Sequence, residues 1–224
     1  MRFVLSLFMF AAGAWAQQQT AADDASAKAT RGMPARATPN DYQAHTKVGD
    51  YSIGAEFFQH TVPTPNGILV NDDYIVVEAG IFGPAGSHTK LNPEDFSLRI
   101  NAKKNPQASE AYPLVYKGLK DPEWEAPEAI AAKKNGGDSK TSLGGGSAGG
   151  QGAAGDPKPV YHPPFKLQRE WNQRLEKQAF PEGDRPLPQA GLLFFLYRGK
   201  ASGIHQLELI YNGPAGKVSL ELQP

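Results

Sequence analysis

The sequence predicts a mainly β protein, an antiparallel β-sandwich of about seven strands. Three observations predict it: short segments in which apolar and polar residues alternate, turn residues between these segments, and a single segment with helical periodicity. The chain has 224 residues, of which 24 are Gly and 19 are Pro. This length suits one domain with appendages.

Residues 1–16 have the features of a secretory signal peptide. A positive charge and an apolar stretch are followed by Ala14-Trp15-Ala16, the small-x-small pattern of a cleavage site between Ala16 and Gln17. The apolar stretch is about 14 residues long, whereas a membrane-spanning helix needs ~20. We therefore expect an exported protein, periplasmic or secreted, that keeps no transmembrane segment after the signal peptide is removed.

Two segments are too polar, or too rich in small residues, to join a core. Residues 17–41 are mostly Gln, Ala, Thr, Ser, Asp, Arg and Lys, which predicts a disordered lead-in. Residues 119–164 are predicted to be a flexible Pro/Gly-rich insertion, and residues 136–155 have the composition of a linker. The remaining residues, 42–118 and 186–224, predict one β-sandwich domain that is discontinuous in the sequence.

Strand-like alternation occurs in both parts of this domain. The expected strands are residues 51–58, 74–82 and 96–100 in the first part and residues 192–197, 207–211 and 218–222 in the second. Asn66-Gly67 and residues 212–216 supply turns. Residues 192–197 are apolar on both faces, which is typical of a strand in the middle of a sheet.

The predicted core joins the two parts of the domain. An exposed strand that is apolar on both faces would aggregate, so residues 192–197 are expected inside a sheet that residues 42–118 help to form. The side chains expected to be buried are Ile75, Val77, Ile81, Phe96, Leu98, Ile100, Phe194, Leu207, Leu209, Val218 and Leu220.

One amphipathic helix is expected at residues 165–180, packed on the sandwich. Its apolar side chains recur at every fourth position: Leu167, Trp171, Leu175 and Ala179. Pro163-Pro164 stands where the first turn of a helix tolerates proline, and Pro181 ends the pattern. The alternative is a helix that binds a partner or a membrane surface, but four apolar positions are few for strong interfacial binding.

Four segments together form a recognisable pattern. They are residues 73–79 (Asp-Tyr-Ile-Val-Val-Glu-Ala), 91–98 (Leu-Asn-Pro-Glu-Asp-Phe-Ser-Leu), 204–211 and 218–222. Over roughly 70–100 and 190–222 the chain resembles a family of bacterial extracytoplasmic immunoglobulin-like domains of unknown function, many of which are secreted or lipoproteins. The resemblance implies an immunoglobulin-like sandwich. The lipid anchor does not carry over, because the chain has no Cys to accept it.

The proline turn within this pattern also has a physical explanation. Pro93 fixes its own φ angle and is expected to open the turn. Asp95 is expected to accept backbone N–H groups there. Phe96 is then expected to begin the inward-facing register of the next strand.

Composition and spacing exclude several chemistries. Without Cys there is no disulfide scaffold, thiolate metal site or catalytic cysteine. Lys+Arg and Asp+Glu are 23 each, so the chain lacks the positive balance expected of a nucleic-acid-coating protein, and Lys103-Lys104 and Lys133-Lys134 are isolated pairs. The histidines are too far apart in sequence for a local metal motif: His45, His60, His88, His162 and His205.

Two glycine motifs are explained by composition alone. Residues 144–149 satisfy the G-x-G-x-x-G spacing of dinucleotide-binding proteins, and residues 145–149 satisfy the G-x-S-x-G spacing of hydrolases. Both motifs need a strand before them and a helix after them. Linker-like sequence surrounds them here, so neither activity is expected.

Two acidic clusters also have simpler explanations. Asn71-Asp72-Asp73 alone supplies too few oxygen ligands for calcium and is expected to form a turn in which Asx side chains bond to their own backbone. A carboxylate pair beside an aromatic residue can be a glycosidase site. A proline-broken loop cannot fix that geometry, so a solvated acidic loop is expected around Trp124, with Glu123, Glu125 and Glu128.

We therefore expect a non-catalytic binding or accessory module whose contacts are made by loops or by an exposed sheet edge. Its partner would be a protein or another component of the cell envelope. The alternatives are a structural envelope component and an enzyme whose site is assembled across the sandwich. The sequence assigns no catalytic, cofactor-binding or metal-binding residue; Ala16 and Gln17, at the signal cleavage site, are the functional residues that it identifies.

Overall fold

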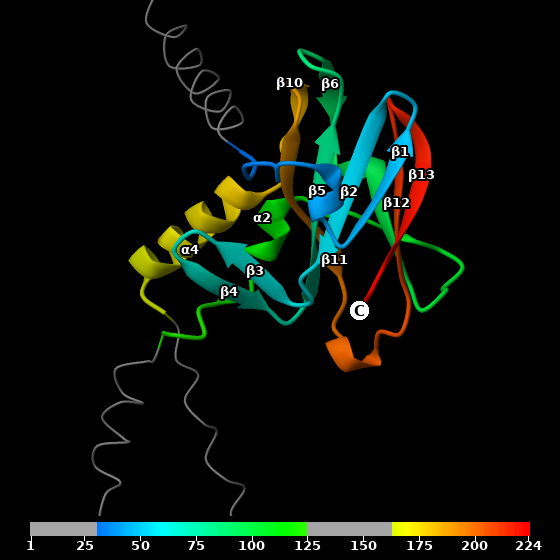
Figure 1. Cartoon of the computed structure of the whole chain (residues 1–224). Coiled ribbons are helices and arrows are strands. Elements are labelled where there is room, and N and C mark those ends of the chain that lie inside the picture. The colour runs from blue at the N-terminus through cyan, green and yellow to red at the C-terminus, as the bar shows by residue number, and fades with distance from the viewer. Residues whose placement is uncertain (1–30, 125–162) are drawn as a thin grey trace, which may run out of the picture.

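The computed structural model describes residues 31–124 and 163–224, which form two packed antiparallel sheets (Figure 1). The central sheet has the order β1 (Ala44–Val48), β2 (Tyr51–Phe57), β5 (Tyr74–Phe82) and β11 (Gln189–Leu196). The outer sheet has the order β13 (Gly216–Leu222), β12 (Leu207–Gly213), β7 (Phe96–Ile100) and β8 (Gln107–Ala108). The mainly β sandwich predicted from the sequence is confirmed.

A third layer covers the other face of the central sheet (Figure 1). It contains a small sheet with the order β3 (Thr61–Thr64), β4 (Gly67–Asn71) and β9 (Leu119–Lys120), and the helices α2 (Tyr112–Val115) and α4 (Phe165–Gln178). Strands β6 (His88–Leu91) and β10 (Gly183–Pro186) form a two-stranded ribbon. Three short 3-10 turns are η1 (Pro39–Asp41), η2 (Pro93–Asp95) and η3 (Ala201–Gly203).

The described residues form thirteen strands instead of about seven. The six segments expected from alternation correspond to β2, β5, β7, β11, β12 and β13, and for β5 and β7 the bounds agree. Most of the additional strands are short. The sequences of β6 (His-Thr-Lys-Leu) and β10 (Gly-Asp-Arg-Pro) are mainly polar, so no alternation could reveal them.

Strands β5 and β11 contribute alternate side chains to two separate cores. The first core lies between the central and outer sheets and receives Ile75, Val77, Ala79, Ile81, Leu193 and Phe195 from these two strands. The second core lies beneath the third layer and receives Tyr74, Val76, Leu192 and Phe194. Tyr74 to Ile81 are consequently all buried.

The pairing of β5 with β11 brings together segments that are far apart in the sequence. The two strands are antiparallel, with Val77 opposite Leu193 and Ile75 opposite Phe195. Residues from both sides of the insertion therefore share the central sheet.

Ten of the eleven predicted core residues are buried. Val218 is half-buried because β13 is the edge strand of the outer sheet. Phe194 is buried in the second core instead of between the two main sheets.

Helix α4 covers the second core, as its apolar pattern predicts. Trp171 and Leu175 are buried there. The helix begins directly after Pro164, whose carbonyl accepts the N–H groups of Leu167 at 2.9 Å and Gln168 at 3.1 Å. Within the described part of the chain, no helix is both long and apolar enough to span a membrane.

Backbone pairing with β11 determines where α4 ends. The helix ends at Gln178, not at residue 180 as expected. Phe180 instead donates its backbone N–H to the carbonyl of Leu192 on β11, at 2.9 Å. The chain comes so close at this point that a Cβ on Gly191 would lie 2.4 Å from the Cα of Phe180, which explains the glycine.

Residues 31–41 are ordered, which corrects the expectation that the whole of 17–41 is a disordered lead-in. Met33 donates its backbone N–H to the carbonyl of Ala190 at 2.8 Å, and the side chain of Arg31 is 6% exposed. Their polar composition does not prevent packing, because charged groups on the sheet supply partners. Ala16, Gln17 and the rest of the segment up to residue 30 lie outside the described residues.

The start of the expected insertion is also part of the fold. Strand β9 pairs with β4, and the ring of Trp124 packs edge-on against Trp171 with centroids 6.0 Å apart. This corrects the expectation of a flexible insertion for residues 119–124. Residues 125–162, with the glycine motifs, lie outside the described residues.

Arg36 holds the N-terminal segment on the central sheet. Its guanidinium Nη2 donates to Oε2 of Glu78 at 2.8 Å, and its Nη1 forms an ion pair with Glu56. The guanidinium carbon lies 4.4 Å from the centroid of the Tyr42 ring. Glu56 and Glu78 are directly opposite each other on β2 and β5, so Arg36 neutralises two like charges at one point of the sheet.

Tyr42 fits over a pair of glycines on the same sheet. Gly54 and Gly80 are opposite each other, and a Cβ on either would lie within 2.4 or 2.5 Å of Tyr42. The glycines therefore provide the space in which the ring lies. Burial, together with the charge of Glu78, raises the pKa of the Tyr42 hydroxyl above its usual range.

Replacing Arg36 with Met should lower the free energy of unfolding by about 2–4 kcal/mol, because the buried carboxylate of Glu78 loses its cation. The matched control is Arg198→Met, which breaks an exposed ion pair with Asp73 and should cost about 0–1 kcal/mol. Urea denaturation measures both. Equal losses in the two variants would contradict the proposed role of Arg36.

Candidate functional site

The outer edge of β11 is already occupied by other parts of the chain. Three backbone N–H groups donate to its carbonyl oxygens at 2.8–2.9 Å: Met33 to Ala190, Phe180 to Leu192 and Glu110 to Phe194. An edge paired in this way cannot accept a partner strand. The outer edge of β11 is therefore excluded as a docking edge, while loops and the other edge strands, such as β1 and β13, remain as the contact modes expected from the sequence.

The four histidines in the described residues lie apart from one another. His45 lies on β1, His88 on β6 and His205 just before β12. The ring of His60 lies between backbone carbonyls, with Nδ1 2.8 Å from Tyr74 O and Nε2 2.9 Å from Gly199 O. Within residues 31–124 and 163–224, no group of three or more His, Cys, Asp or Glu side chains is arranged to hold a metal ion.

The Asn71-Asp72-Asp73 cluster forms the expected turn. The Asn71 side chain accepts the N–H of Asp73 at 3.0 Å and donates to the carbonyl of Val115 at 2.7 Å. Asp72 pairs with Lys120, and Asp73 pairs with Arg198 at 3.2 Å. These oxygens therefore fix the turn and its neighbours.

The acidic segment around Trp124 is only partly described. Glu123 donates its backbone N–H to the side chain of Asp121 at 3.0 Å, which makes a local turn. Glu125 and Glu128 lie outside the described residues, so the expected acidic loop stays a prediction.

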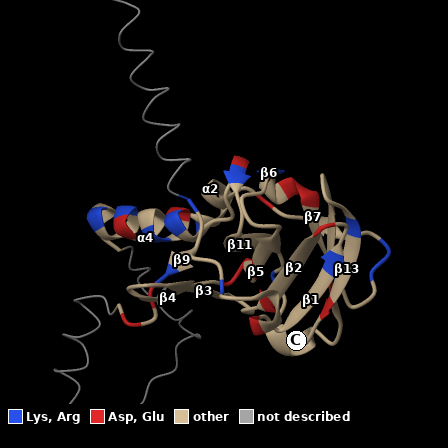
Figure 2. Ribbon diagram, turned by 45° about the horizontal axis from the view of Figure 1, so that its top comes forward, with Lys and Arg blue, Asp and Glu red and all other residues tan. Residues whose placement is uncertain are grey.

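A polar hollow of about 570 Å³ lies between α4 and the β3–β4 turn. Its Arg174 is fully engaged: Nη2 donates to Thr64 Oγ1 at 3.0 Å and to Asn66 O at 2.8 Å, and Nη1 pairs with Asp121 at 3.4 Å. Glu170 and Lys177 add charges of both signs to the lining, and Figure 2 shows acidic and basic residues mixed along α4. We interpret this hollow as part of the junction at which Arg174 of α4 holds the β3–β4 hairpin against the helix.

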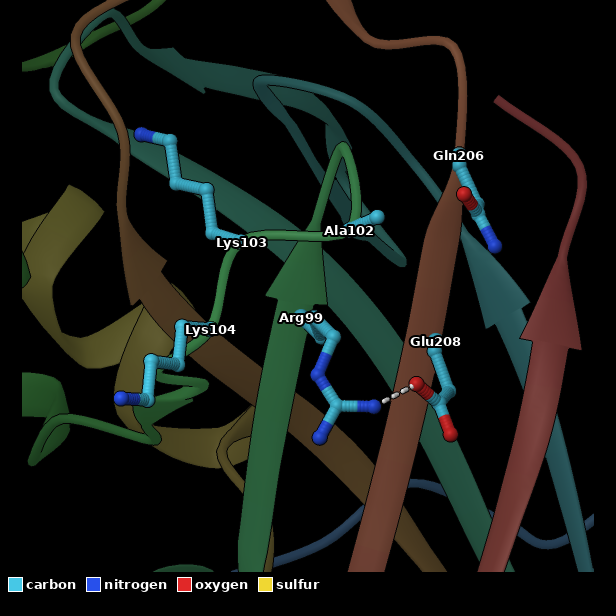
Figure 3. Close-up of a pocket in the computed structure, with 6 residues that line it drawn as sticks. All are labelled: Arg99, Ala102, Lys103, Lys104, Gln206 and Glu208. Atoms are coloured by element: carbon cyan, nitrogen blue, oxygen red, sulfur yellow. Dashed lines mark hydrogen bonds and ion pairs between the residues drawn. The ribbon is translucent and has the colours of Figure 1, made fainter.

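A second hollow, of about 310 Å³, lies at one end of the outer sheet (Figure 3). We call it the basic groove; it is lined by Arg99, Ala102, Lys103, Lys104, Gln206 and Glu208. The two lysines extend from the loop after β7, while Gln206 and Glu208 belong to the neighbouring strand segment. Three cationic residues and one carboxylate thus line one open depression, with Arg99 directed towards Glu208 and the two lysine side chains extending away from it.

Arg99 and Glu208 form the base of the basic groove. They are directly opposite each other on β7 and β12, and Nη1 of Arg99 donates to Oε2 of Glu208. Their side chains are 34% and 23% exposed. The pairing fixes the guanidinium on the sheet, and Glu208 Oε1 accepts no hydrogen bond from the described residues.

The loop that presents the lysines has an unusual backbone. Asn101 and Ala102 both adopt left-handed conformations, with φ of 51° and 55°. The Asn101 side chain locks the loop: Nδ2 donates to Gly203 O at 2.8 Å, and Oδ1 accepts the N–H of His205 at 2.7 Å. A left-handed Ala costs roughly 1–2 kcal/mol, so other contacts must maintain this conformation.

The sequence analysis identified Lys103-Lys104 but treated it as an isolated pair. Arg99 joins the pair because β7 and the following loop bring all three cations to the same end of the outer sheet. The alternation of β7 shows only that Arg99 points outward. The other wall comes from Gln206 and Glu208, and no local sequence signal indicates which strand lies beside β7.

Comparisons of the chain with protein-family models, curated proteins and solved structures found no match. The resemblance to the immunoglobulin-like family therefore stays a prediction. The functional argument depends on the geometry of the chain itself.

The turn before β7 differs from the one expected. The Asn92 side chain, not that of Asp95, accepts a turn N–H, from Glu94 at 3.0 Å. Partial burial, and the charge of Glu94 in addition, raise the pKa of the Asp95 carboxyl above its usual value, while Lys90 lowers it. The ionised form of Asp95 is thus disfavoured in the folded protein.

Replacing Asp95 with Asn should stabilise the protein at pH 7. A carboxyl whose pKa is raised on folding contributes stability at low pH, and that contribution is lost as the pH rises through the folded-state pKa. Because Asp95 is partly solvated, the gain should be below about 1 kcal/mol, and it should vanish near pH 3.

Urea denaturation at the two pH values measures this effect, with Asp50→Asn as the matched control at an exposed position. A loss of stability at pH 7 in the Asp95→Asn variant would show that the carboxylate makes a favourable contact.

Proposed function

We propose that this protein is an exported, non-catalytic binding module and that the basic groove is its binding surface. The sequence supports export through the predicted signal peptide, with cleavage between Ala16 and Gln17. The partner would be an anionic protein or another anionic component of the cell envelope. The immunoglobulin-like sandwich implied by the resemblance would serve as the rigid scaffold for this loop.

The observation that carries the proposal is the locked loop beside Arg99. Ala102 adopts a left-handed backbone conformation that is unfavourable for alanine. Both polar atoms of the Asn101 side chain form hydrogen bonds that hold the loop in place. Strain of this kind is typical of segments whose geometry matters for function. Here the strained turn leads directly into Lys103 and Lys104, which line the groove together with Arg99.

The chemistry of the groove favours binding over bond breaking. Its polar groups are three cations, an amide and a carboxylate that already pairs with Arg99. Cationic side chains attract anions and donate charge-assisted hydrogen bonds to them. An enzyme site would instead bring a nucleophile or a proton-transferring group towards a substrate.

Reversing the two lysine charges should weaken binding. We expect the variant Lys103→Glu/Lys104→Glu, immobilised and exposed to an anionic envelope fraction, to retain about tenfold less material than the original protein, a difference of ~1.4 kcal/mol. The matched control is Lys47→Glu/Lys166→Glu, which changes the net charge equally at two exposed positions outside the groove.

Retention by the original protein should also weaken as salt is added, because exposed charges are screened. Equal retention by the groove variant and the control would contradict the assignment of the basic groove. Circular dichroism of each variant checks that the fold is intact.

A further inference from the structure

We propose that the basic groove recognises an acidic glycan, a sugar chain that carries carboxylates. This inference rests on the proposed function, because it names the ligand of the same groove. Three properties of the groove carry it: an excess of positive charge, a hydrogen-bond acceptor beside the cations, and a small open shape.

The charge of the groove is a local feature. The whole chain has 23 basic and 23 acidic residues, so it is neutral. In the groove, Arg99 is paired with Glu208, while Lys103 and Lys104 extend from the loop on the other side of Arg99, away from this carboxylate (Figure 3). This surplus of two positive charges is complementary to an anionic ligand.

Because Glu208 is itself negatively charged, a purely anionic ligand fits the groove less well than a ligand that also carries hydrogen-bond donors. Its Oε2 is bound to Arg99, and none of the described residues donates a hydrogen bond to its Oε1. A ligand made only of anionic groups would be repelled by this carboxylate. A sugar acid instead brings hydroxyl groups that donate to a carboxylate and carboxylates that accept from Lys or Arg. Gln206 adds an amide that can donate to or accept from the same hydroxyl groups.

The size of the groove suits part of a polymer. About 310 Å³ lies at the lower limit of small-molecule sites. The depression would therefore hold one or two sugar units of a longer chain. The remaining units would extend along the open face of the outer sheet, where Asn212 and Ser219 are exposed.

Calorimetric titration with an oligogalacturonate tests the proposal. Two ligands of the same length serve as controls: the methyl-esterified oligogalacturonate, which keeps the hydroxyls but loses the charges, and an oligoglutamate, which keeps the carboxylates but lacks the hydroxyls. We expect both controls to bind at least about tenfold more weakly than the oligogalacturonate. Equal affinity for oligoglutamate, or no measurable binding of oligogalacturonate, would overturn the proposal.

Two variants locate the effect. Lys103→Gln/Lys104→Gln should weaken the binding of oligogalacturonate by about tenfold or more. Glu208→Gln should reduce the preference for oligogalacturonate over oligoglutamate, because the repelling carboxylate is removed. An unchanged preference in Glu208→Gln would contradict the assigned role of this residue. Thermal melting of both variants checks that the sandwich is preserved.

The same variants distinguish the two proposals. If oligogalacturonate does not bind but retention of envelope material still depends on Lys103 and Lys104, the glycan assignment is wrong and the binding function stands. If the lysine variant retains as much envelope material as the original protein, the basic groove is not the binding surface and both proposals fail.

Discussion

Strands β5 and β11 are apolar on both faces, and this constraint determines the rest of the architecture. Burial of apolar surface is the main favourable term in folding, and a two-layer sandwich buries only one face of each sheet. The outer sheet covers the side of Ile75 and Val77, while the side of Val76 and Phe194 needs a further layer. The small sheet and α4 form that layer, so they are structural parts of the domain and not additions to it.

The constraint also explains the polar contacts at the margin of the second core. Glu78 lies on the face of β5 that the third layer covers only in part, and its carboxylate there needs a cation. Arg36 supplies the cation and at the same time packs on Tyr42. The N-terminal segment is thereby fixed beside β11, where Met33 closes part of the sheet edge. The outer sheet has no comparable requirement on its far side, which leaves that face free to present polar residues and the basic groove.

The sequence predicts those elements whose stability is visible in their own residues. The alternation of β5 and β7 gives their bounds, and the fourfold spacing of Trp171 and Leu175 gives the buried face of α4. Elements that depend on distant partners are not visible in this way: β6 and β10 are polar strands that exist because they pair with each other. The same reason hides the ordered residues near Arg36 and the meeting of Arg99 with Glu208, since each depends on a register between segments far apart in the chain.

The central claim is that segments on both sides of residues 125–162 form one domain through the β5–β11 pairing. A specific protease site inserted between Gly136 and Gly155 allows the folded protein to be cut there. Size-exclusion chromatography without denaturant then measures whether the two pieces stay together. Our account predicts a single species with the elution volume of the uncut protein, because separation would expose Val77, Phe194 and their neighbours to water. Two separately eluting folded fragments would show that each part makes its own core and would contradict the account.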